Sequence, residues 1–197
     1  MIDLEKPPEL DTTGWLNVDD VPTLAALKGK VVVVLAFQML CPGCVSHALP
    51  QLQRLRERFG EADVAILALH TVFEHHDVMT PKALQAFVHE YKFSFPIGID
   101  TPSGEDIPKT MLAYEMRGTP TLLIYDRQGR LRRHYFGRPD DLVLGAELMA
   151  MVLETDARAT EQVLSRALLM PGHRHDHDDH GHHHHEHGDG CGCGHSH

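Results

Sequence analysis

The sequence predicts an α/β domain in which a central mixed β-sheet is flanked by helices. Three observations support this class. Strand-like and helix-like apolar patterns alternate along the chain up to about residue 170. One apolar run, residues 31–37, is followed directly by a pair of cysteines and then by a helical pattern. The 197 residues, 42% of them hydrophobic, suffice for one such domain with a core and an appendage.

The same patterns assign the elements in order along the chain. Thr80 is a favourable N-cap with Pro81 at the first helical position, and residues 126–130 are typical of the turn of a β-hairpin. We expect strands at residues 31–37, 64–69, 95–99, 122–125 and 131–136, and helices at residues 43–59, 81–91, 109–114, 140–153 and 160–170.

Two cysteines, Cys41 and Cys44, stand where the first buried strand turns into a helix. This spacing is typical of thiol-disulfide chemistry, because the N–H groups and partial positive charge of a helix N-terminus stabilise a thiolate. Cys41 is therefore the expected attacking sulfur, and Cys44, one turn further, is the expected resolving sulfur. Half of a zinc site is the alternative, but the only other cysteines, Cys191 and Cys193, lie far away in the sequence.

Composition and charge exclude several partners and compartments. The formal net charge of -10, with 18 basic against 28 acidic residues, argues against a nucleic-acid surface. Residues 1–8 are acidic and contain proline, unlike a secretory leader, and no apolar run approaches the length of a bilayer span. We expect a cytoplasmic protein without membrane or nucleic-acid partners.

The composition changes sharply at Pro171, which ends the last helical pattern. We expect two parts: a folded domain over residues 1–170 and a tail over residues 171–197. The tail carries almost no apolar side chains, so it cannot offset its ordering entropy by burial, and we expect disorder without a ligand.

The tail is rich in metal-ligating groups, with 11 of the 17 histidines and a Cys-Gly-Cys sequence. Imidazole and thiolate suit nickel, zinc and copper, and carboxylates and cysteines among the histidines set the tail apart from an expression tag. The expected metal ligands are His173, His175, His177, His180, His182, His183, His184, His185, His187, Cys191, Cys193, His195 and His197.

Three further histidines, His70, His75 and His76, follow the second buried strand. Their proximity in sequence allows a metal site, but Glu74 and Asp77 beside them favour a solvated turn.

The chain resembles the thioredoxin superfamily, in particular its TlpA-like and redoxin branch, over about residues 12–153. In that family the Thr-Pro bond before the hairpin is cis and lies beside the two cysteines, leaving a backbone edge for an incoming peptide or thiol. The resemblance assigns this part to Thr119 and Pro120. It rests on residues 14–17, 24–34, 41–44, 69–74, 117–126 and Gly129.

The sequence also departs from this family. Leu40 replaces a frequent tryptophan and Leu35 replaces the buried acid of thioredoxins, so their usual proton relay is missing. Where TlpA-like reductases often carry a glutamate, this chain has His47, three residues after Cys44, which suits either a proton relay or a solvent-facing side chain. Arg117 suits stabilisation of an anionic group or an ordinary surface charge.

Three functions follow from these residues. The first is a thiol-disulfide oxidoreductase that acts on protein or small-molecule disulfides, draws on a thiol reductant system and needs no redox cofactor. The second is a peroxiredoxin-like peroxidase, in which Cys41 attacks peroxide and Cys44 resolves the sulfenic acid. Gln38 and Val34 stand where peroxiredoxins carry Thr or Ser and Pro, which counts against this reading, although Arg117 would match the peroxidase arginine. The third is a metal store or carrier on a redoxin scaffold.

Overall fold

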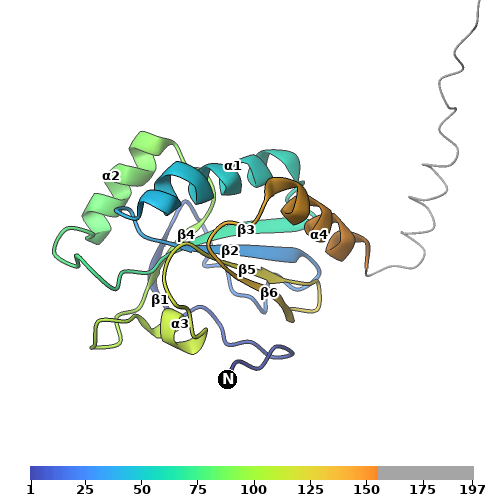
Figure 1. Ribbon diagram of the computed structural model, residues 1–197, viewed down its shortest axis with the longest axis horizontal. Coiled ribbons are helices and arrows are strands. Elements are labelled where there is room, and N and C mark those ends of the chain that lie inside the picture. Colours follow the sequence, from blue (N-terminus) through green and yellow to red (C-terminus); the bar gives the residue numbers. More distant parts are fainter. Residues whose placement is uncertain (155–197) are drawn as a thin grey trace, which may run out of the picture.

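The structure is a computed structural model and describes residues 1–154 (Figure 1). Its elements, in chain order, are β1 (Thr12–Leu16), β2 (Val31–Phe37), the π-helix η1 (Cys44–Ala48), α1 (Leu49–Arg58), β3 (Val64–His70), α2 (Pro81–Tyr91), β4 (Ile97–Asp100), α3 (Lys109–Ala113), β5 (Thr121–Tyr125), β6 (Leu131–Phe136) and α4 (Asp141–Leu153).

Six strands form one mixed sheet in the order β1-β4-β3-β2-β5-β6. The central strands β2, β3 and β4 are parallel, whereas β5, β6 and β1 are antiparallel to their neighbours. Helices α1, α2 and α4 cover one face of the sheet, and α3 lies on the other face with the N-terminal segment (Figure 1). The predicted fold class, a mixed sheet flanked by helices with a thioredoxin-like topology, is confirmed.

The central strand β2 is buried along its whole length, as its unbroken apolar sequence predicts. Because successive side chains point to opposite faces, Val33 and Leu35 contribute to the core under α1 and α4, and Val34 contributes to the core under α3. The end of β2 is thereby fixed from both sides, and the cysteines follow directly after it.

The largest differences between the predicted and the observed elements concern β1, the start of β4 and the helix after the cysteines. Strand β1 was not predicted, because its short sequence has no clear alternation. It lies at the edge of the sheet, where its Thr12 and Trp15 pack so closely on Gly98 of β4 that a Cβ atom there would lie 3.1 Å from both side chains. The third predicted strand begins two residues later than expected, at Ile97. The predicted helix over 43–59 is divided into η1 and α1.

The described residues contain no helix long and apolar enough to cross a membrane. The predicted domain boundary at residue 171 and the predicted helix over 160–170 lie outside the part of the chain that the structure describes.

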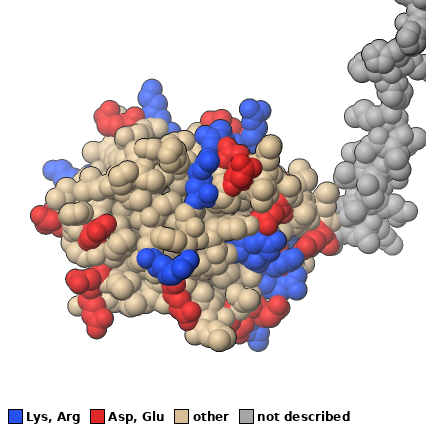
Figure 2. Space-filling model, in the orientation of Figure 1, with Lys and Arg blue, Asp and Glu red and all other residues tan. Residues whose placement is uncertain are grey.

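The β5–β6 hairpin is held by Asp126, whose side chain is 1% exposed. Its Oδ1 accepts the backbone N–H groups of Gln128 and Arg130, both at 3.0 Å, and its Oδ2 pairs with Arg130 at 2.7 Å and Arg132 at 3.2 Å. Burial raises the pKa of Asp126, but the hydrogen bonds from Arg130 and Arg132 outweigh it and leave this pKa below its ordinary value. Figure 2 shows basic and acidic side chains next to one another at the end of the molecule where β6 and α4 lie.

We predict that Asp126→Asn lowers the free energy of unfolding by about 2 kcal/mol at pH 7, since two charge-assisted hydrogen bonds are lost. Because the folded-state pKa is depressed, this contribution is complete above the unfolded pKa of about 3.9 and is lost as pH falls through the lower folded value. Urea titrations of the parent and variant between pH 3 and 7 measure the difference. Asp19→Asn, at an exposed position, is the control. A difference that stays constant down to pH 3 would contradict the prediction.

Candidate functional site

The two cysteines lie at the carboxyl end of β2, where the chain enters η1. Cys41 stands just before the helix, and its carbonyl accepts the N–H groups of Cys44 at 3.0 Å and Val45 at 3.1 Å. The N–H of Cys44 also points at Sγ of Cys41, 3.3 Å away. Cys41 therefore lies at the N-terminus of the helix, as expected from the sequence.

The first turn of this helix is wide because of Pro50. A proline has no N–H to donate and its ring collides with the carbonyl four residues earlier, which here belongs to Ser46. The turn before Pro50 avoids this collision by forming an i→i+5 hydrogen bond, in which the N–H of Leu49 donates to the carbonyl of Cys44.

Cys44 lies fully buried in the core between the sheet and helices α1 and α4, with 0% of its side chain exposed, whereas Cys41 is partly exposed. Burial, reinforced by the neighbouring Cys41, raises the pKa of Cys44 to about 12, against the smaller opposite effects of the Gln38 backbone and the Thr119 hydroxyl. Cys44 is consequently a neutral thiol at physiological pH. The two sulfurs are free thiols with different access to solvent.

The Thr119–Pro120 segment lies beside the cysteines, as the resemblance implied, and its peptide bond is cis. Sγ of Cys41 is 3.5 Å from the carbonyl oxygen of Thr119. A Cβ atom added to Gly43 would lie 3.6 Å from Cδ of Pro120, so the glycine between the cysteines and this proline are in contact. Residues almost eighty positions apart thus form one site.

Gln38 is a component of the site that sequence reasoning noted only as a departure from peroxiredoxins. Its side chain is 1% exposed, its Oε1 accepts the N–H of Phe73 at 3.3 Å, and its Nε2 lies 3.5 Å from Oε1 of Glu74. Its carbonyl accepts the N–H of Cys41 at 3.2 Å. Gln38 therefore joins the cysteine turn to the loop after β3. The only signal in the sequence was a polar residue directly after an apolar strand.

The other two predicted site residues make no hydrogen bond to either sulfur within residues 1–154. His47 is exposed. This position agrees with the solvent-facing alternative for His47, and the wide π-turn separates residues i and i+3 around the helix axis more than an α-helix does. Arg117 is exposed and its guanidinium lies 5.1 Å from the centre of the Phe136 ring. Their functional roles remain predictions.

The histidines after β3 do not form one turn, and the solvated-turn interpretation is wrong for His70. His70 is the last residue of β3 and only 2% exposed, whereas His75 and His76 are exposed on the following loop. Among residues 1–154, no group of three or more His, Cys, Asp or Glu side chains is arranged to hold a metal ion. The histidines and cysteines of the predicted metal-binding tail, from His173 to His197, lie outside the described residues.

Sheet order, the dithiol at the end of β2 and the cis-proline beside it define a thioredoxin-like protein. The chain belongs to the AhpC/TSA family, which matches residues 9–134. No match was found among curated proteins.

Solved structures support the same assignment. The chain is 54% identical to the thioredoxin-like superfamily protein SPOA0173, with a TM-score of 0.73 over 74% of this chain and 94% of that one. It is 48% identical to a thiol-disulfide isomerase from Corynebacterium glutamicum, with a TM-score of 0.72 over 75% and 96% of the two chains. A thioredoxin-like protein solved in its oxidised form, at 21% identity and a TM-score of 0.62 over 75% and 93%, shares the fold.

We predict that limited alkylation with iodoacetamide at pH 6 modifies Cys41 well before Cys44. The reason is that Cys44 is buried and, with its raised pKa, remains protonated, whereas only a thiolate attacks the reagent. Peptide mapping by mass spectrometry separates the two positions and distinguishes both from Cys191 and Cys193. Earlier labelling of Cys44 would contradict the assignment.

Proposed function

We propose that the protein is a thiol-disulfide oxidoreductase that uses Cys41 and Cys44 to reduce disulfides. The observation that carries this proposal is the pairing of a partly exposed Cys41 with a buried Cys44 whose N–H lies 3.3 Å from the Cys41 sulfur. Membership of the AhpC/TSA family and 48% identity to a thiol-disulfide isomerase support the same chemistry.

In the proposed reaction the thiolate of Cys41 attacks one sulfur of the substrate disulfide. A mixed disulfide forms, and the other substrate sulfur leaves as a thiolate that takes up a proton. Cys44 then loses its proton and attacks Sγ of Cys41. The Cys41–Cys44 bond forms, the mixed disulfide breaks, and the second substrate sulfur leaves as a thiolate that takes up a proton. The two electrons needed to reduce the Cys41–Cys44 disulfide come from a thiol reductant. We propose that the protein and this reductant are in the cytoplasm.

The order of the two attacks follows from the environment of Cys44. Burial is the main cause of its raised pKa, and the adjacent Cys41 raises this pKa further through a hydrogen bond and its charge. Once Cys41 is held in a mixed disulfide, its charge is gone and that second effect disappears. Cys44 is then easier to ionise at the step where it is needed. His47 would have to assist through water, because its side chain is exposed.

The docking edge for the substrate is formed by the segment before β5. The Thr119 carbonyl lies near Cys41, and the proline that follows has no N–H. Leu40, beside the reactive cysteine, is 53% exposed, and Phe136 under Arg117 is also 53% exposed. We propose that the apolar part of a substrate lies on these two side chains.

A peroxidase is the second candidate, favoured by the family match. Two observations favour disulfide reduction instead. The side chain of Gln38, at the position where peroxiredoxins carry a hydroxyl, is directed to the loop after β3 through Phe73 and Glu74. Arg117, the residue that would match a peroxidase arginine, lies over Phe136. Turnover of insulin disulfides and of hydrogen peroxide, compared at equal enzyme concentration, distinguishes the two.

We predict that Cys44→Ser abolishes turnover of a disulfide substrate and accumulates a mixed disulfide on Cys41, because the second displacement has lost its nucleophile. Non-reducing gels and intact mass spectrometry detect the adduct, and Cys41→Ser, which forms none, is the control. Turnover by Cys44→Ser at the parental rate would exclude a two-cysteine mechanism.

We further propose that residues 171–197 bind nickel, zinc or copper through their imidazoles and thiolates. The full chain should bind several equivalents of nickel in calorimetric titrations, and a variant ending at Met170 should bind none. Affinity should fall as pH drops through the imidazole pKa of about 6.5, because protons compete for the ligand nitrogens. Equal nickel binding by the two chains at pH 7.5 would contradict this proposal.

A further inference from the structure

Helix α4 is apolar on the side that faces away from the sheet as well as on its buried side. Leu144 and Leu148 are buried in the core together with residues of the sheet. On the opposite side, Leu142 is 85% exposed and Met149 is 47% exposed. We call this side the outer face of α4, and its exposed residues are Leu142, Val143, Ala146, Met149 and Ala150.

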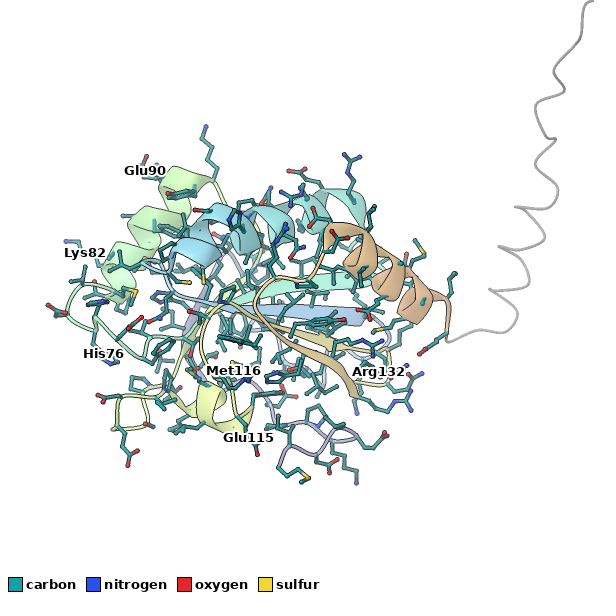
Figure 3. The ribbon with its side chains drawn as sticks, viewed as in Figure 1. His76, Lys82, Glu90, Glu115, Met116 and Arg132 are labelled. Atoms are coloured by element: carbon teal, nitrogen blue, oxygen red, sulfur yellow. The ribbon has the colours of Figure 1, made fainter. Side chains whose placement is uncertain are left out.

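The other two helices of this layer have charged side chains on their exposed sides. Helix α1 exposes Arg54, Glu57 and Arg58. Helix α2 exposes Lys82 and Glu90, whose side chains point into solvent (Figure 3). The apolar outer face is therefore particular to α4 and is not shared by its layer.

The two charged residues of α4 lie beside the outer face and already have partners. Asp141 pairs with Arg54 at 2.8 Å, and Glu147 pairs with Arg133 at 2.7 Å. A helix that is apolar on all sides is normally covered on all sides. Among residues 1–154 nothing covers the outer face, as the exposure of Leu142 shows. We therefore expect a covering segment from outside this part of the chain.

The sequence that follows α4 has a complementary pattern. A helix is predicted over residues 160–170, with Thr160 as a favourable N-cap and Pro171 directly after its last residue. In such a helix one side would be apolar and would carry Val163, Leu164, Ala167, Leu168 and Met170. The other side would carry Glu161, Gln162, Ser165, Arg166 and also Leu169.

Length and linkage also favour this segment over a second copy of the chain. The 13 residues of α4 span about 20 Å, and residues 160–170 would span about 16 Å as a helix. Residues 155–159 join the two, a length typical of the loop between antiparallel helices. So short a link holds the segment near the outer face at an effective concentration on the order of millimolar, which a second copy does not reach at ordinary protein concentrations.

The two ends of α4 lie near different parts of the sheet. At its C-terminal end, Arg132 pairs both with Glu154 at 2.6 Å and with Asp126 of the β5–β6 hairpin at 3.2 Å. Shortly before its N-terminal end, the N–H of Gly137 donates to the carbonyl of Pro120 at 2.8 Å, beside the dithiol. An antiparallel helix on α4 would therefore carry the chain from the hairpin back toward the cis-proline.

We propose that residues 160–170 form a helix that packs antiparallel on the outer face of α4 and returns the chain to the dithiol end of the sheet. Met149 then lies beside Leu164, and Leu142 lies beside Met170. The small Ala146 and Ala167 let the two helices approach closely. The His- and Cys-rich tail consequently begins beside the dithiol and not at the hairpin. The docking itself does not depend on the proposed redox reaction.

Methyl NOEs in the metal-free, full-length chain test both the contact and its direction. With labelled Leu, Val and Met methyl groups, we expect NOEs from Met149 to Leu164 and from Leu142 to Met170. No NOE between the outer face and residues 160–170 would overturn the proposal. NOEs in the reverse order, from Leu142 to Leu164 and from Met149 to Met170, would overturn the antiparallel arrangement.

A mixture of labelled and unlabelled chains distinguishes the chain's own segment from a second copy. Isotope-filtered spectra of this mixture record only NOEs between different molecules. We expect none that involve the outer face of α4. Filtered NOEs from Leu142 or Met149 would show that another copy covers this face, and would overturn the proposal.

Hydrogen exchange measured by mass spectrometry adds matched variants. An isolated helix of this length is marginal in water, so slow exchange of residues 160–170 reports docking. The double variant Leu142→Lys/Met149→Lys removes the apolar contact and should speed exchange of this segment about tenfold. The control Gln162→Lys/Ser165→Lys adds the same charge on the opposite side of the segment and should leave its exchange unchanged.

Exchange of the central strands β2 and β3 shows whether the variants remain folded. Because Leu142 and Met149 are exposed within residues 1–154, we expect these strands to be protected equally in the parent and both double variants. Exchange of residues 160–170 in the parent at the rate of an unstructured peptide would overturn the proposal. So would unchanged slow exchange of this segment in a folded Leu142→Lys/Met149→Lys protein.

Discussion

The burial of Cys44 in the core is the constraint on which the rest of the dithiol site depends. A side chain with no exposure at the first turn of the helix fixes the rotation of that helix, so that Leu49 and Leu52 also face the sheet. Cys41, three residues earlier, is then brought to the surface with its sulfur facing the N–H of Cys44. Packing alone therefore makes Cys41 accessible and keeps the chemically identical Cys44 buried.

The same packing makes the site depend on distant parts of the chain. Gln38 bonds to the loop after β3 through its side chain and to Cys41 through its carbonyl. From the other side, the Thr119–Pro120 segment contacts Cys41 and Gly43. These contacts exist because both strands pair with β2: the parallel β3 ends beside the cysteine turn, and the antiparallel β5 begins there. The central position of β2 in the sheet is thus what allows two neighbours to enclose one dithiol.

The sequence predicted most of this arrangement wherever the signal was local. The apolar run of β2, the capped helix beginning after Thr80 and the hairpin around Asp126 are set by neighbours in the chain, and they were placed within a residue or two. Strand β1 was missed because its pairing with β4, including the close contact with Gly98, is tertiary. The π-turn that carries His47 was not predicted, because it depends on how the helix accommodates Pro50. The roles of Gln38 and His70 were not predicted because they depend on burial, and the sequence does not show whether an isolated polar residue is buried.

The dithiol and the cavity at the carboxyl ends of β3 and β4 both lie at the edge of the sheet where the parallel strands end. Because β2, β3 and β4 run in the same direction, the segments that follow them meet at this edge, where backbone leaves the sheet and side chains from several loops converge. The segment after β2 supplies the two sulfurs, the last residue of β3 supplies a buried imidazole, and the segments after β3 and β4 line an apolar cavity. Phe37 and His70, paired in register across β2 and β3, form the boundary between the two.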